Sequence, residues 1–146
     1  MTTAPHPTEQ EPRVPPTRSS IGPLVRSGAL AGAVAAGCTT VMAAVASAAG
    51  VSLVVDGTAI PVPAFAWWTL VGAALGVVLA RLLRERRRFV VVSTVAAGLS
   101  LIPPIAAADD TATTVVLVGA HVLAAAIIIP ALSQQLPHQQ RPLTVR

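Results

Sequence analysis

The stretch TLVGAALGVVLARLLRERRRFVVVSTVAAGLSLIPPIAA, residues 69–107, decides the fold of this chain. In it, two apolar runs flank five arginines, Arg81, Arg84, Arg86, Arg87 and Arg88. Each run, with its apolar flanks, can supply the roughly 20 apolar residues that a helix needs to cross a bilayer. Arginines beside such helices mark the cytoplasmic side of a membrane protein. The stretch therefore predicts two membrane-spanning helices joined by a short cytoplasmic turn.

The charges outside this stretch continue the same alternation. Every basic side chain is an arginine, and the other five lie near the two ends of the chain: Arg13, Arg18, Arg26, Arg141 and Arg146. The two remaining connections contain acids instead, namely Asp56, Asp109 and Asp110. This distribution predicts four spans, with the N- and C-termini both in the cytoplasm.

The composition supports the same class of protein. Of the 146 residues, 53% are hydrophobic and only 11% are charged, whereas a soluble domain carries about 25% charged residues. We therefore predict an all-α integral membrane four-helix bundle over residues 24–132. The expected spans are about 24–49, 64–83, 89–107 and 113–132.

The segments outside the expected spans have distinct compositions. Residues 1–23 contain six prolines and predict a disordered cytoplasmic tail, and residues 133–146 predict a polar cytoplasmic tail. The segment VSLVVDGTAIPV, residues 51–62, predicts a short extracytoplasmic β-hairpin around Asp56-Gly57. A cleaved signal peptide ending at Ala46-Ser47-Ala48 is the less favoured interpretation of the first span, because its apolar run is long for that role.

Small residues recur at intervals of four in two expected helices. The first helix has the stripe Gly28, Gly32, Ala36, Thr40, Ala44 and Ala48, and the second has Gly72, Gly76 and Ala80. Such stripes let helix backbones approach closely in lipid. They predict helix packing, and packing within the chain is favoured over a dedicated dimer face.

Two features in the second half of the chain predict where helices end and begin. Pro103 lacks an amide hydrogen and its ring clashes with the carbonyl of Leu99, which predicts a kink or an early helix end. Asp109 and Asp110 precede Thr111, which predicts an acidic N-cap on the fourth helix, at the positive end of its dipole.

His121 is the only ionisable side chain well inside an expected span, and polar groups at that depth are functional candidates. A proton relay or a ligand contact is one hypothesis. The favoured one is a neutral imidazole bonded to a neighbouring helix. The candidate partners on other helices are Ser93, Thr94, Ser100 and Thr40.

Several kinds of chemistry find little support in the residues. The single cysteine, Cys38, excludes an intramolecular disulfide, and the lone membrane histidine argues against haem. The acids do not supply the set of ligands that a hard cation needs, so no metal or cofactor is expected. No paired acid and base indicates catalysis. The arginines are expected to meet anionic lipid headgroups, not nucleic acid, because aromatic residues for base stacking are scarce.

The chain also resembles a known family. The carrying segments are AAGVSLVVDGTAIP (48–61), TLVGAALGVVLARLLRERRRFV (69–90) and LSLIPPIAAADDTATTVVLVGAHVLAAAIIIPAL (99–132). In these it is similar to the small four-helix membrane proteins of actinobacteria grouped as domain of unknown function 6069. The resemblance implies four spans and a membrane location, and no activity.

Together with the resemblance, these observations favour a bacterial inner-membrane protein without catalytic activity. It is expected to act by helix packing with a second copy of itself or with another membrane protein. The main alternative is a small transporter or channel subunit that uses His121. A membrane enzyme is the least favoured hypothesis.

Overall fold

The computed structural model describes residues 21–137 of the chain. In order, the elements are α1 (Ile21–Ala48), β1 (Val54–Val55), β2 (Thr58–Ala59), α2 (Val62–Leu83), α3 (Arg86–Leu99), α4 (Ile102–Ala107) and α5 (Thr111–Ser133). Four helical segments are long and apolar enough to cross a membrane, because α3 and α4 together form one such segment, Arg86–Ala107. The predicted helical fold with four candidate spans is thus confirmed, together with its small hairpin.

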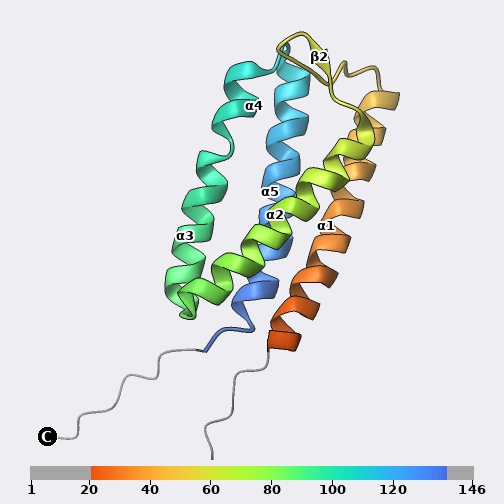
Figure 1. Ribbon diagram of the computed structural model, residues 1–146. Coiled ribbons are helices and arrows are strands. Elements are labelled where there is room, and N and C mark those ends of the chain that lie inside the picture. The colour runs from red at the N-terminus through yellow and green to blue at the C-terminus, as the bar shows by residue number, and fades with distance from the viewer. Residues whose placement is uncertain (1–20, 138–146) are drawn as a thin grey trace, which may run out of the picture.

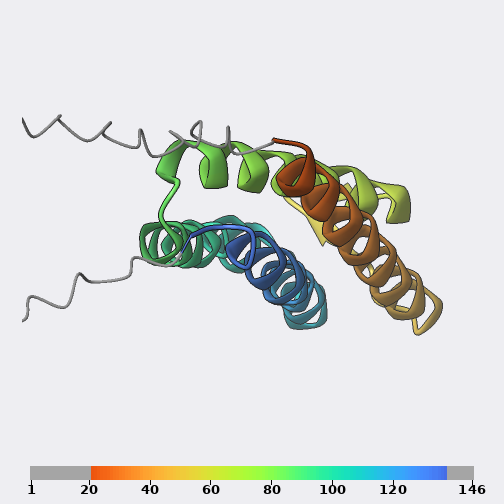
Figure 2. The same ribbon diagram turned by 90° about the horizontal axis from the view of Figure 1, so that it is seen from below.

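Helix α5 lies at the centre of the bundle and contacts each of the other four helices. Helix α2 runs obliquely across the front in Figure 1, from the α1 side at the top to α3 at the bottom. Seen from below in Figure 2, α1 and α2 form one layer, and α3 and α5 form a second. The contacts of α1 with α5, and those of α2 with α3 and α5, join these two layers.

The core is small and divides into two clusters along the bundle. One lies toward the start of α1 and consists of Ala35, Ala73, Ala80, Phe89, Ile128, Leu132 and Leu136. The other lies toward the hairpin and consists of Ala43, Leu53, Phe65, Leu117 and Ala120. Many large apolar side chains are exposed instead, including Trp67 at 65% and Leu82 at 73%. Such an outer surface suits a bilayer, where lipid tails are as apolar as the side chains they touch.

The charged residues separate toward the two ends of the bundle. The start of α1, the α2–α3 turn and the end of α5 lie at the bottom of Figure 1, and the hairpin and the α4–α5 turn lie at the top. The arginines of the described residues belong to the bottom end: Arg26, Arg81, Arg84, Arg86, Arg87 and Arg88. Asp56, Asp109 and Asp110 belong to the top end. Most of the expected tails, residues 1–23 and 133–146, lies outside the described residues. Of the described part, residues 21–23 belong to α1 and Ser133 ends α5, so the helices extend slightly into both expected tails.

The third span breaks where the proline pair predicts it. Helix α3 ends at Leu99, and α4 begins at Ile102, one residue before Pro103. Pro103 cannot donate to the carbonyl of Leu99, so the α-helical ladder stops there. The Ser100 hydroxyl donates to the carbonyl of Ala97 at 2.7 Å and satisfies one of the last carbonyls of α3.

The hairpin forms around Asp56-Gly57, as the sequence predicts. Asp56 and Gly57 have φ values of 47° and 71°, and positive φ at both central residues is the requirement of a type I′ turn. A lone two-stranded hairpin is marginal in water, and here the α4–α5 connection supplies further bonds. The Asp56 amide donates to Ala107 at 3.0 Å, and the Asp109 amide donates to Val54 at 3.2 Å. The hairpin is therefore hydrogen-bonded to the connection that leads into α5.

The two acids of the α4–α5 connection have different roles. Asp110 caps α5, because its Oδ1 accepts from the Thr113 amide at 2.8 Å. Its Oδ2 accepts from the hydroxyls of Ser52 at 2.6 Å and Thr113 at 2.7 Å. Asp109 does not cap the helix; its Oδ2 accepts from the Gly57 amide at 3.1 Å. The joint N-cap expected for both acids is thus wrong for Asp109, because the hairpin turn brings an unpaired amide closer to it.

The pKa of Asp110 is lowered from 3.8 to about 2, first by the bond from Ser52 and then by those from Thr113. A carboxyl with a lowered pKa stabilises the fold fully above its ordinary pKa. That stabilisation is lost as the pH falls through the folded value. We therefore expect the thermal stability of the purified protein to fall as the pH drops from 3.8 toward about 2.

In the Asp110→Asn variant this part of the fall should be absent, because no carboxylate remains to be protonated. The matched control is Asp56→Asn, which removes an exposed carboxylate but leaves the bonds of Asp110 to Ser52 and Thr113 in place, so the fall due to Asp110 should remain. Melting curves of the three proteins across this pH range provide the measurement. Identical profiles for wild type and Asp110→Asn would contradict the assignment.

Candidate functional site

The glycines of the first predicted stripe lie against α2. A Cβ placed on Gly28 would overlap Cγ2 of Val77, and one on Gly32 would lie 2.8 Å from Cβ of Ala73. Glycine is the residue that permits so close an approach of two helices. This face of α1 is therefore occupied by packing within the chain.

The later residues of the first predicted stripe turn away from the contact between α1 and α2. Ala36 is buried and Thr40 is half-buried, but Ala44 and Ala48 are exposed. An i, i+4 stripe rotates by about 40° per step on a helix of 3.6 residues per turn, so it leaves the contact after a few steps. On α2, a Cβ on Gly76 would lie 3.1 Å from Cδ1 of Leu132 on α5.

Gly72 lies away from every packed face of the described bundle. It is exposed, and a Cβ placed on it meets no atom within 4 Å. It is the one predicted packing glycine that the structure does not bring against another helix. A larger side chain can therefore be placed there without disturbing the bundle.

A second row of small residues on α1 is exposed except at Thr40, which is half-buried. It consists of Ala29, Ala33, Gly37, Thr40, Ala44 and Ser47, and we call it the open small-residue face. A Cβ placed on Gly37 meets nothing within 4 Å, and Thr40 donates its hydroxyl to the carbonyl of Ala36 at 2.7 Å. Beside Ala29 a groove of about 280 Å³ runs along the seam of α1 and α2. The face is thus small, flat and uncovered.

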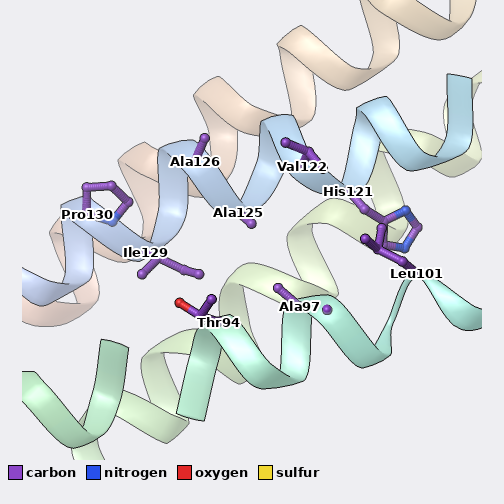
Figure 3. A pocket seen from close by; sticks show the side chains of 10 residues that line it. Thr94, Ala97, Leu101, His121, Val122, Ala125, Ala126, Ile129 and Pro130 are labelled. Atoms are coloured by element: carbon purple, nitrogen blue, oxygen red, sulfur yellow. The ribbon is translucent and has the colours of Figure 1, made fainter. Parts of the chain in front are cut away.

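A larger groove lies between α3 and α5, with a volume of about 430 Å³ (Figure 3). We call it the α3–α5 groove. Its lining is mostly apolar, and Thr94 and His121 are the lining residues with polar side chains. The full lining consists of Thr94, Ala97, Gly98, Leu101, His121, Val122, Ala125, Ala126, Ile129 and Pro130. His121 and Leu101 lie at one end of the groove in Figure 3, and Pro130 lies at the other.

The His121 ring bonds to its own helix. Nδ1 lies 2.8 Å from the carbonyl oxygen of Leu117, one turn earlier on α5. A carbonyl can only accept, so this bond places the hydrogen on Nδ1 and leaves Nε2 of the neutral ring as an acceptor. The expected bond to another helix is replaced by this local one, because a residue's own i−4 carbonyl is within reach of its ring. Of the four expected partners, only Thr94 also lines the groove.

The hydroxyls of the other three expected partners do not bond to His121. Thr40 and Ser100 bond to carbonyls of their own helices. Ser93 is 9% exposed, and its hydroxyl has no hydrogen-bond partner among residues 21–137. Two other hydroxyls do bond across helices, Thr39 to Thr69 and Ser27 to the carbonyl of Ala131. Among residues 21–137, however, no hydrogen bond links His121 to another side chain.

The arginine turn is compact. Arg84 is the C-cap residue of α2, with φ of 50°, and Glu85 is the N-cap residue of α3. Arg88 Nε lies 2.7 Å from Glu85 Oε2, and because Arg88 is exposed and Glu85 only half-buried, such a surface pair contributes at most about 1 kcal/mol. Arg81, Arg84, Arg87 and Arg88 are exposed, and Arg86 is half-buried. The turn therefore presents several cations at one level of the bundle.

Metal chemistry receives no support from the described part of the chain. Between residues 21 and 137, no group of three or more His, Cys, Asp or Glu side chains lies close enough to hold an ion. Cys38 is a free cysteine that is exposed on α1.

Four long apolar helices, with arginines at one end of the bundle and aspartates at the other, are the features of a multi-pass membrane protein. The sequence comparison agrees with this class, since the chain matches the family of unknown function DUF6069 over residues 19–138. The chain belongs to that family. Neither the curated proteins nor the solved structures give a match.

The structure reveals two surfaces that the sequence did not single out, the open small-residue face and the α3–α5 groove. The spacing of Ala29, Ala33 and Gly37 was a readable signal for the first. It could not be separated from the neighbouring Gly28 and Gly32 stripe without knowing which side of α1 meets α2. The groove has no signal in any one segment because residues from two helices form it.

Proposed function

We propose that this protein is a bacterial inner-membrane component without catalytic activity, and that it acts by packing against another transmembrane helix. The surface that binds this helix is the open small-residue face of α1. Its partner is a second copy of the chain or another membrane protein. Both termini and the arginine turn lie in the cytoplasm, which follows from the positive-inside rule.

The observation that carries the proposal is that α1 has small residues on two faces and uses only one. Gly28 and Gly32 already meet α2, whereas Ala29, Ala33 and Gly37 touch no other helix closely enough to be buried. Helix association in lipid depends on van der Waals packing, for which a face of small residues is the usual surface. Such a face along a whole span is therefore well suited to a partner helix.

His121 is a weaker basis for a function. Its Nδ1 is held by Leu117, and the described interior gives it no charged neighbour to exchange a proton with. A transporter needs polar groups in series across the bilayer. The packing proposal needs only the surface described above.

The proposal predicts a specific pattern of disulfide cross-linking in native membranes. With Cys38 replaced by alanine, an Ala33→Cys substitution should give a cross-linked product, because residue 33 lies on the open small-residue face. Gly37→Leu should abolish that product, since its side chain blocks close approach while meeting nothing inside the bundle.

Two matched controls are available. Leu75→Cys, exposed on α2, should cross-link poorly, and Gly72→Leu should leave the Ala33→Cys product unchanged. The mass of the product distinguishes a second copy from a different protein. If Ala33→Cys gives no product, or if Gly37→Leu has no effect on it, the proposal is wrong.

A further inference from the structure

The α3–α5 groove extends over one half of the membrane thickness. On α5 its lining runs from Pro130 to His121, about 14 Å at ~1.5 Å per residue. Half of a hydrocarbon core of about 30 Å is about 15 Å. Pro130 lies three residues from the end of α5, on the arginine side of the bundle. The groove therefore begins near the arginine-side surface and ends close to the middle of the membrane.

A cation lies below the open end of this groove. Arg87 precedes Thr94 by seven residues, so the two share a face of α3 to within about 20°. Thr94 lines the groove, and Arg87 is exposed about 10 Å nearer the surface. The guanidinium thus lies at the level where a phospholipid carries its phosphate.

The start of α3 adds to this positive region. Glu85 precedes the helix but makes no side-chain cap bond to it. The positive end of the helix dipole lies at this turn and favours an anion there. Together with Arg87, it forms a region that complements a phosphate group directly below an apolar groove.

The length of the groove decides between two occupants. A partner helix would need a contact along most of a span of about 30 Å, whereas the groove closes at His121 and Leu101 after about half of it. An acyl chain of the arginine-side leaflet needs only the depth of that leaflet. Small side chains at Ala97, Gly98 and Ala125 leave space for such a chain.

We propose that the α3–α5 groove holds one acyl chain of an anionic phospholipid from the arginine-side leaflet. The phosphate of this lipid lies against Arg87 and the first turn of α3. The site is distinct from the open small-residue face, and it gives the protein a defined lipid partner beyond the general attraction of arginines to a membrane surface.

Native mass spectrometry of the purified full-length protein tests the site. The delipidated protein is equilibrated with phosphatidylglycerol and phosphatidylcholine that carry the same acyl chains, and the bound lipid is counted. Wild type should retain phosphatidylglycerol in preference to phosphatidylcholine.

Two variants probe the two parts of the site. Gly98→Leu should weaken the binding of phosphatidylglycerol about tenfold, because its side chain fills the groove and a Cβ there meets nothing within 4 Å. Arg87→Gln should weaken it about fivefold, the effect of one arginine near an anionic headgroup. Each has a matched control, Gly72→Leu on the exposed side of α2 and Arg81→Gln in the same arginine belt. Both controls should bind as wild type does.

Three results would overturn the proposal. One is equal binding of phosphatidylglycerol by Gly98→Leu and wild type. Another is equal loss of binding in Arg81→Gln and Arg87→Gln, which would indicate general attraction in place of a site. The third concerns disulfide cross-linking between two chains that both carry Ala125→Cys. If adding Gly98→Leu abolishes this cross-linking but leaves lipid binding unchanged, the groove is an interface with another helix.

Discussion

The Gly28→Leu variant should lose about 3 kcal/mol of unfolding free energy, the upper end of the usual cost of overpacking. Even a single Cβ at this position overlaps Cγ2 of Val77 and lies 3.2 Å from Cδ2 of Leu132. Val77 is branched at Cβ and has essentially one side-chain rotamer in a helix, so it cannot turn aside. Unfolding in mixed micelles of increasing SDS content, followed by circular dichroism, measures the loss.

The matched control for this variant is Gly72→Leu, in which the same side chain extends from α2 into open space. Its stability should lie within about 0.5 kcal/mol of wild type, as for other surface substitutions. A double-mutant cycle adds a second check, because Val77→Ala should recover most of what Gly28→Ala loses. Wild-type stability in Gly28→Leu would show that α1 and α2 do not pack through this glycine.

The Phe89→Ala variant should lose about 3 kcal/mol, the lower end of the range for a buried phenylalanine. Phe89 is 1% exposed and belongs to the cluster that joins α2, α3 and α5 near the arginine turn. The cavity and the lost van der Waals contacts account for the expected cost. The part that comes from transfer out of water is reduced, since the surroundings of the bundle are apolar.

Val91→Ala is the matched control for Phe89→Ala, because Val91 lies on the same helix and is 55% exposed. It should change the unfolding free energy by less than about 0.5 kcal/mol. The same SDS titration compares the two variants. If Val91→Ala costs as much as Phe89→Ala, then α3 is rotated relative to the fold described above.

The elements that the sequence predicts are those that depend on local chemistry. The four apolar segments, the Asp56-Gly57 turn and the helix end before Pro103 appear where their residues place them. In each case residues that are close in the sequence cause the structure, as the missing amide hydrogen of Pro103 causes the helix to end. The N-cap at Asp110 belongs to the same group, because it needs only the amide of Thr113.

The features that the sequence does not predict depend on how the helices are turned. In a soluble protein a polar face reveals which side of a helix faces outward, but in α1 small and apolar side chains occupy every face. Its glycine stripe and its open small-residue face are therefore indistinguishable until α2 is in place. Asp109 shows the same limit, because its partner Gly57 is 52 residues away in the chain.

The most direct test of the central claim, a four-span bundle with its arginine turn on one side and its hairpin on the other, is labelling by a membrane-impermeant maleimide. Single cysteines are introduced as Thr58→Cys in the hairpin and Arg87→Cys at the start of α3, both exposed positions, with Cys38 replaced by alanine. In intact cells or spheroplasts Thr58→Cys should be labelled and Arg87→Cys should not, and both should be labelled after permeabilisation. Equal labelling of the two positions before permeabilisation would place the hairpin and the arginine turn on one side of the membrane and contradict the account.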